Sequence, residues 1–234
     1  MTQTTQTIAE NYRAVQARVT AACQRAGRDP ASVTLIAVTK YAEIEWVRRL
    51  VELGASELGE SRPQQLVQRA HEIPGQVHWH LIGPLQRNKV RSILPLTTLI
   101  HSADSLRLLE GINRIAGELA LRPRVLIEVN LSGEAARHGF QTGDLLAAWQ
   151  NILKLPHVEI DGLMTMAAYS LDPESARPAF VRLRELRDEL QSRSGPLGVR
   201  LEQLSMGMTG DFEVAIEEGA TMIRVGTALF GERE

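Results

Sequence analysis

The chain alternates between segments with helical spacing and short apolar runs. A first helix is predicted from Ile8 to Arg25, because its apolar residues recur at intervals of about three to four positions. Gly27 and Pro30 are typical of the end of such a helix. Two later segments have the same spacing, at Leu106, Leu109, Ile112, Ile115 and Leu119, and at Phe180, Leu183, Leu186 and Leu190.

Apolar runs between the helical segments predict strands. Strands that alternate with helices pair in parallel through right-handed crossovers. Eight such units favour a single closed (β/α)8 TIM-like barrel with an extra N-terminal helix, one domain over residues 1–234. An open doubly wound sheet is the alternative, since sequence does not show closure. The expected strands are Val33–Val38, Glu57–Gly59, His78–Ile82, Thr98–His101, Val125–Val129, Val158–Leu163, Leu201–Leu204 and Met222–Val225.

Composition narrows the class of protein. The net charge is −2 with acids and bases interspersed, which gives no reason to expect nucleic-acid or membrane binding. No apolar stretch is long enough to span a membrane, and the polar segment from Met1 to Thr7 is unlike a secretory signal. The single cysteine, Cys23, cannot form an internal disulfide, so a cytoplasmic location is expected.

The loops after the last two expected strands combine glycine with hydroxyl residues. In a barrel, the loops that follow the strands build the site, and phosphate groups bind between strands seven and eight. Backbone N–H groups, a hydroxyl and glycine together make an anion-binding cradle. The alternative is a purely structural role, in which Thr209 caps a helix and the glycines make turns. Candidates for the cradle are Ser205, Gly207, Thr209, Gly226 and Thr227.

Lys40 follows the first expected strand, in a chain where only three of 26 basic residues are lysines. If the strand stays extended, Lys40 shares a face with Val38 and Ile36. Partial removal from water at an apolar barrel mouth favours a neutral amine, which can form an imine with an aldehyde. A solvated loop lysine is the alternative. A lysine opposite a phosphate cradle indicates a phosphate-bearing aldehyde, and pyridoxal 5′-phosphate (PLP) is one.

Arg224 ends the eighth expected strand, beside the first if the barrel closes. There it could donate to a pyridine nitrogen, or pair with Glu217 or Glu218. His80 and His101 have no partner at metal-ligand spacing, so no metal site is predicted and a hydrogen bond to the backbone is the favoured expectation for each.

Several motifs resemble the pyridoxal phosphate homeostasis protein family, which is related to the N-terminal barrel of alanine racemase. The resemblance extends from about Val33 to Gly231. It is carried by Ala37-Val38-Thr39-Lys40, Gly59-Glu60-Ser61, Trp79-His80-Leu81-Ile82-Gly83, Gln86-Arg87-Asn88-Lys89, His101-Ser102-Ala103-Asp104-Ser105, Gly162-Leu163-Met164-Thr165, Leu204-Ser205-Met206-Gly207-Met208-Thr209 and Arg224-Val225-Gly226-Thr227-Ala228-Leu229-Phe230-Gly231.

The resemblance implies a barrel that carries PLP as a Schiff base on Lys40. It also implies that Arg224 faces the pyridine nitrogen. Ser205, Gly226 and Thr227 would hold the phosphate, and Ser61, Met164 and Met206 would lie in the cofactor pocket, although core packing remains an alternative for both methionines.

Three positions depart from the family pattern. Thr39 stands where Ser is frequent, which keeps a hydroxyl. Ser61-Arg62 stands where Asn-Tyr is frequent, and Asn would be a hydrogen-bonding residue of the pocket, so the resemblance is weaker at Ser61 than at the other site residues. Pro84 stands where His is usual and removes an imidazole and a backbone donor. The roles of Gln86 and Lys89 stay open, and both are expected on the following helix.

Holding the cofactor differs from using it. The related racemase barrel takes its catalytic tyrosine from a further domain, so this chain is expected to be a non-catalytic carrier in intracellular PLP homeostasis, with no catalytic residue. Tyr41 is expected to point away from Lys40 by strand alternation. The alternatives are a slow PLP-dependent amino-acid racemase and a cofactor-free barrel enzyme acting on a phosphorylated metabolite. The oligomeric state, a monomer included, stays open, as do PLP-dependent enzymes or regulatory proteins as partners.

Overall fold

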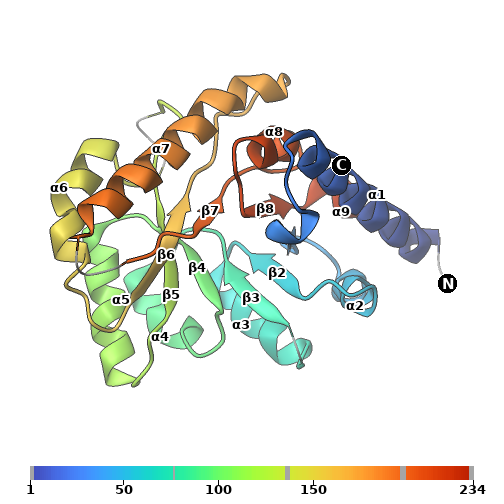
Figure 1. The fold of residues 1–234 in the computed structure, drawn as a ribbon. Coiled ribbons are helices and arrows are strands. Elements are labelled where there is room, and N and C mark those ends of the chain that lie inside the picture. Colours follow the sequence, from blue (N-terminus) through green and yellow to red (C-terminus); the bar gives the residue numbers. More distant parts are fainter. Residues whose placement is uncertain (1–2, 76, 135–137, 196–198, 232–234) are drawn as a thin grey trace.

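Eight parallel strands close into a barrel in the order in which they occur in the chain (Figure 1). The computed structural model describes residues 3–75, 77–134, 138–195 and 199–231. Closure confirms the predicted (β/α)8 barrel, and the open-sheet alternative is wrong. All eight expected strands form, with bounds that differ by at most two residues. They are β1 (Thr34–Val38), β2 (Glu57–Glu60), β3 (His78–Leu81), β4 (Leu99–Ala103), β5 (Arg124–Glu128), β6 (Glu159–Met164), β7 (Gln203–Ser205) and β8 (Met222–Val225).

Helices surround the barrel, and the additional first helix packs beside the last two. The expected helices at residues 8–25, 106–119 and 180–190 are confirmed, and the first begins earlier, at Gln3. The α-helices are α1 (Gln3–Arg25), α2 (Ile44–Glu52), α3 (Pro63–Glu72), α4 (Val90–Ile93), α5 (Leu106–Glu118), α6 (Thr142–Ile152), α7 (Arg177–Arg193), α8 (Phe212–Glu217) and α9 (Thr227–Phe230), with 3-10 turns η1 (Pro30–Ser32), η2 (Arg87–Lys89) and η3 (Pro173–Ala176).

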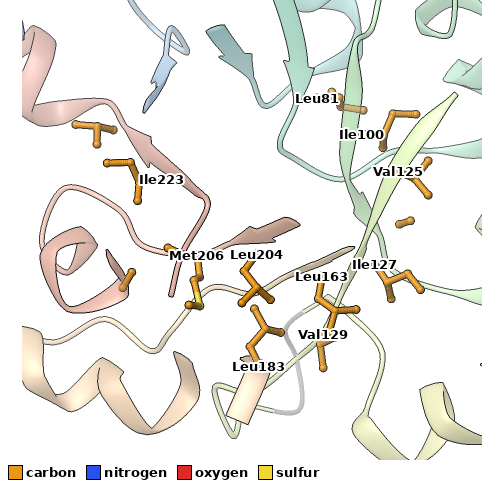
Figure 2. Close-up of a cluster of buried hydrophobic side chains, with 14 of the residues drawn as sticks. Leu81, Ile100, Val125, Ile127, Val129, Leu163, Leu183, Leu204, Met206 and Ile223 are labelled. Atoms are coloured by element: carbon orange, nitrogen blue, oxygen red, sulfur yellow. The ribbon is translucent and has the colours of Figure 1, made fainter. Parts of the chain in front are cut away.

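Alternation along the strands separates an outer core from an inner one. The outer core lies between the barrel and its helices, where Leu163 and Leu204 approach Leu183 of α7 (Figure 2). The inner core is small and consists of Ile36, Leu99, Leu126, Met164 and Met222, with Met166 packed against it.

Polar residues occupy other inward positions. His101 is two residues beyond the inner Leu99, and Arg224 is two residues beyond the inner Met222, so both side chains share the inner face of their strands. The barrel interior therefore contains both apolar and polar side chains. None of the described helices has the length and hydrophobicity needed to cross a membrane.

Candidate functional site

The carboxyl ends of β1 and β8 lie side by side at the barrel mouth. Ala37 pairs with Val225, and a Cβ atom at Gly226 would lie 3.3 Å from the Cβ of Val38. The loop after β7 joins this group, because the backbone N–H of Ala228 donates to Thr209 Oγ1 at 3.4 Å. The loops that carry the predicted cradle and the loop that carries Lys40 therefore share one rim, as the sequence analysis requires.

Lys40 lies in a turn, so the expectation that it continues the strand is wrong. β1 ends at Val38, and the N–H of Ala42 donates to the carbonyl of Thr39 at 3.0 Å. Tyr41 has φ +67°, a left-handed conformation that non-glycine residues rarely adopt and that concentrates at functional sites. Lys40 is exposed, and its Nζ lies 5.9 Å from the centroid of the Tyr41 ring. The mouth therefore does not desolvate this amine, and the ring of Tyr41 stays near it.

Buried polar groups beneath this turn hold it in place. Thr39 Oγ1 donates to Glu60 Oε1 at 2.6 Å, and Arg69 Nε lies 3.0 Å from the same oxygen. Arg69 Nη2 donates to the carbonyl of Ala42 at 2.5 Å. Burial raises the pKa of Glu60, although Thr39 and Arg69 lower it. The Arg69–Glu60 contact is a charge pair without good hydrogen-bond alignment, since Arg69 Nε has no hydrogen-bond partner among the described residues.

A line of polar side chains crosses the barrel interior. Ser205 Oγ lies 2.8 Å from His101 Nδ1, and His101 Nε2 lies 2.9 Å from His80 Nδ1. His80 Nε2 lies 2.7 Å from Glu57 Oε2. Glu57 Oε1 in turn contacts Nδ1 of the exposed His78 at 2.6 Å. The expected backbone hydrogen bonds of His80 and His101 are therefore wrong: in both rings the nitrogens bind side chains.

Arg224 joins the same line from β8. Its Nη1 donates to Ser205 Oγ at 2.5 Å and its Nη2 to the carbonyl of Thr165 at 2.9 Å. Complete burial lowers the pKa of Arg224 to about 10, while Asp211 and Glu128 raise it. The guanidinium therefore remains charged at neutral pH and fixes Ser205 from one side.

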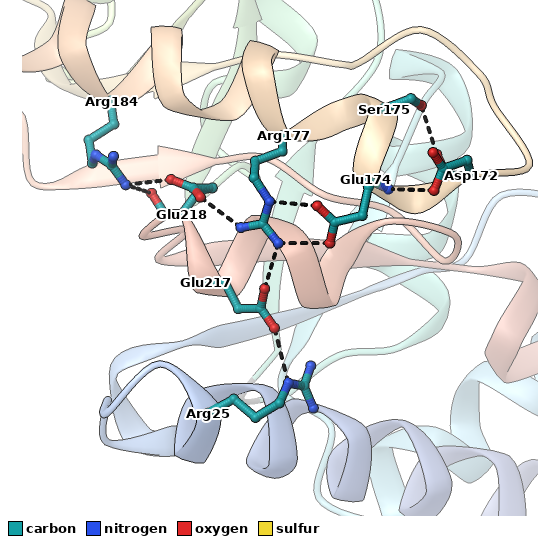
Figure 3. A network of polar contacts seen from close by, with 8 residues as sticks. All are labelled: Arg25, Asp172, Glu174, Ser175, Arg177, Arg184, Glu217 and Glu218. Atoms are coloured by element: carbon teal, nitrogen blue, oxygen red, sulfur yellow. Dashed lines mark hydrogen bonds and ion pairs between the residues drawn. The ribbon is translucent and has the colours of Figure 1, made fainter.

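The alternative ion pair of Arg224 with Glu217 or Glu218 is wrong, because both carboxylates bind other arginines (Figure 3). Arg177 of α7 reaches Glu217 at 2.8 Å and Glu218 at 2.7 Å. Arg25 of α1 also binds Glu217, at 3.0 Å. This surface network ties α1 and α7 to the carboxyl end of α8, the helix that follows the loop after β7.

Sequence reasoning missed Glu128, the last residue of β5. Burial and the nearby charge of Asp104 raise the pKa of Glu128 to about 7, while His138 and Arg224 act to lower it. Its position could have been found by counting, since it lies two residues beyond the inner Leu126. In an eight-stranded barrel β5 lies opposite β1, so this carboxyl group faces the mouth from the side across from Lys40.

The remaining predicted residues divide between the mouth and the core. Ser61 is half-buried after β2, where Gly83 approaches so closely that a Cβ atom would lie 2.3 Å from the Ser61 carbonyl. Gly207 has φ +92° and packs on α8. Met164 lies in the inner core, whereas Met206 lies in the outer core with Leu204 (Figure 2). This placement favours the packing interpretation for Met206.

Three further expectations concern the loops around the site. Thr209 does not cap α8, whose N-cap is Asp211. Gln86 is exposed and precedes η2, in which Lys89 is half-buried, so only Lys89 lies in the expected helical segment. Within the described residues, no cluster of three metal-binding side chains occurs.

Comparison with known proteins defines the class. Residues 5–234 match the family model described as alanine racemase, N-terminal domain. The chain is 42% identical over 226 residues to a pyridoxal phosphate homeostasis protein of Aquifex aeolicus, covering 96% of this chain and 98% of that protein. It is 33% identical to the protein of the same name from Escherichia coli K12, over 97% of both chains. The chain therefore belongs to the pyridoxal phosphate homeostasis protein family.

Solved structures agree with this assignment. PipY of Synechococcus elongatus PCC7942, solved with PLP bound, aligns with a TM-score of 0.85 and 36% identity, over 96% of this chain and 100% of that one. An alanine racemase of Clostridium difficile aligns with a TM-score of 0.73 at 16% identity, over 96% of this chain and 57% of the enzyme. The second likeness concerns the barrel fold.

Proposed function

We propose that this protein binds PLP at the barrel mouth and holds it as a Schiff base on Lys40. The observation that carries the proposal is that Lys40 shares a rim with the Gly226–Thr227 loop, in a chain related over almost its whole length to PipY, whose structure contains PLP. The exposed amine is accessible to an aldehyde. Bound PLP supplies an electron-withdrawing ring to amines attached at its aldehyde carbon.

The residues present fit this cofactor. Gly226 packs against Val38, so a larger residue would press on the β1 backbone that leads to Lys40. Gly207, Thr209, Gly226 and Thr227 offer backbone and hydroxyl groups to a phosphate, and Ser205 offers its hydroxyl from the inner side. Arg224 is fixed beside Ser205 and remains a cation, which suits a pyridine nitrogen that accepts a hydrogen bond. Met164 and Ser61 would border the ring.

We propose that the role is storage or delivery of PLP in the cytoplasm, by a single-domain carrier that acts without turnover. The names of its relatives support a homeostatic role. PLP-dependent enzymes would be the chemically expected recipients. A slow amino-acid racemase remains the second candidate, and Glu128 favours it, because a carboxyl group with a pKa near 7 opposite Lys40 can exchange protons.

Absorbance and borohydride reduction test the binding site. The purified protein with PLP should absorb near ~420 nm, as a lysine–PLP Schiff base does, and reduction should fix the cofactor on Lys40. Lys40→Ala should abolish both signals and keep the fold, whereas Lys154→Ala should change neither. Attachment to Lys89 or Lys154 would contradict the assignment, and a protein with neither absorbance nor attachment would favour the cofactor-free enzyme.

Racemisation assays separate carrier from enzyme. A carrier should racemise amino acids no faster than free PLP does. Racemisation above that level, lost in both Lys40→Ala and Glu128→Gln, would establish the enzyme.

A further inference from the structure

The polar line inside the barrel runs from the cofactor side to the opposite end. Arg224 and Ser205 lie near the mouth, and Glu57 is the first residue of β2, at the amino-terminal end of the barrel. His101 and His80 connect the two ends through contacts of 2.7 to 2.9 Å. We call these five residues the interior chain. Three of them, Glu57, His80 and His101, have no assigned task in the proposed function.

Donor and acceptor counting limits where the hydrogens lie, because ring tautomers follow from their partners. Arg224 only donates, so Ser205 Oγ accepts from it, and the single hydroxyl hydrogen of Ser205 points elsewhere. Glu57 is a carboxylate: burial raises its pKa, but hydrogen bonds from His80 and His78 lower it to about 2. His80 Nε2 must then carry a hydrogen.

Two arrangements satisfy these contacts. In the neutral one, Ser205 donates to His101 Nδ1, and His101 Nε2–H donates to His80 Nδ1. In the protonated one, His80 carries hydrogens on both nitrogens, His101 Nδ1–H donates to Ser205, and the Ser205 hydroxyl hydrogen is released to another acceptor. The two differ by one proton, and every heavy-atom contact is the same in both.

The surroundings favour the neutral arrangement while no anion lies beside Ser205. Burial lowers the pKa of His101 well below its ordinary value, and His80 and Arg224 lower it further. Among the described residues, the charged and titratable groups that act on the histidine pair are Arg224 from β8, Glu57 from β2 and, behind Glu57, His78. In the protonated arrangement the positive charge lies on His80, which contacts the Glu57 carboxylate, and not on His101, which shares Ser205 Oγ with the guanidinium.

We propose that the interior chain couples binding of the phosphate group of PLP to uptake of one proton by the histidine pair. The phosphate draws the hydroxyl hydrogen of Ser205, and the pair passes from the neutral to the protonated arrangement. His80 and His101 are thus positioning residues for the phosphate end of the pocket. This inference rests on the proposed function, since it requires Ser205 to face the phosphate.

The structure also provides an entrance for the proton. Side chains at the Glu57 end are accessible to water, with relative exposures of 24% for Glu57 and 56% for His78. His101 and Ser205 are fully buried. The proton therefore enters at the end of the barrel opposite the cofactor, so bound PLP does not block it.

Calorimetric titration with PLP at pH 7, in buffers of different ionisation enthalpy, measures the protons taken up. Lys40 and the phosphate contribute equally in the wild type and in His80→Gln, so the difference between the two proteins reports the histidine pair. Gln retains one donor and one acceptor. We expect about one proton fewer in His80→Gln than in the wild type. His71→Gln, an exposed histidine on α3, serves as the control and should match the wild type.

Equal proton uptake by the wild type and His80→Gln would overturn the inference. If His80→Gln fails to fold, Glu57→Gln tests the same point, because it removes the carboxylate that stabilises the added charge; uptake equal to that of the wild type would again contradict the coupling. Borohydride trapping on Lys40 is measured in parallel. Loss of trapping in the wild type would overturn the proposed function and this inference together, whereas normal trapping with equal uptake would overturn the inference alone.

Discussion

Replacing Glu57 by Gln should cost stability at neutral pH and little in acid. The pKa of Glu57 is about 2, against an ordinary 4.5, and each unit corresponds to about 1.4 kcal/mol. The shift therefore sets an upper limit of about 3.5 kcal/mol, and because a quarter of the side chain is exposed to solvent we expect about 2 kcal/mol.

The direction of the pH dependence follows from the pKa of Glu57, which is lower in the folded state than in the unfolded state. The stabilisation is present above the unfolded value of about 4.5 and is lost as the pH falls towards 2. Urea unfolding of the wild type and Glu57→Gln should therefore differ at pH 7, and the difference should shrink between pH 4.5 and pH 2. Glu52→Gln is the control, because Glu52 forms an exposed ion pair and its loss should cost less than about 0.5 kcal/mol. A difference of the same size at pH 7 and pH 2.5 would refute the reasoning.

Three further predictions concern other parts of the site. Thr39→Val should destabilise the protein by about 1–3 kcal/mol, because Glu60 loses a buried hydrogen-bond donor, whereas Thr39→Ser should be about as stable as the wild type. Equal losses of stability for the two variants in urea unfolding would contradict this prediction. Glu128→Gln should remove a pH dependence of stability, because the raised pKa of Glu128 makes the stability of the wild type fall as the pH rises from about 4.5 to about 7. A wild type whose stability is constant in that range would contradict this prediction. Gly162→Ala should prevent or severely weaken folding in thermal melts, since its Cβ atom would lie 1.9 Å from the Gln203 carbonyl oxygen, and a wild-type melting temperature would disprove that close contact.

Much of the fold could be predicted because one physical rule governs it. The eight strands are apolar runs that alternate with helical segments, and this pattern depends on local sequence. Closure of the barrel could be inferred only from the number of units, since no local feature requires β1 to pair with β8.

The candidate site could be predicted from the sequence only in part. Lys40 and the cradle loops could be placed on one rim because both follow strand ends. The turn at Lys40 was missed because Glu60 and Arg69 hold it from other elements, which no local pattern records. The contact between His80 and His101 cannot be predicted from either residue alone, because it depends on the barrel bringing their strands together.

The arrangement of α1 has a consequence for synthesis on the ribosome. This helix packs against α8 and α9, and Arg18 and Arg25 bind Glu213 and Glu217 of α8. This helix thus waits for partners almost two hundred positions later in the chain. The part of its surface that packs on α8 and α9 stays uncovered until those helices have been synthesised, and contacts of such long sequence separation form slowly. Docking of the amino-terminal helix is therefore expected to be a late event in folding, one that takes place around a barrel whose last strands have just left the exit tunnel.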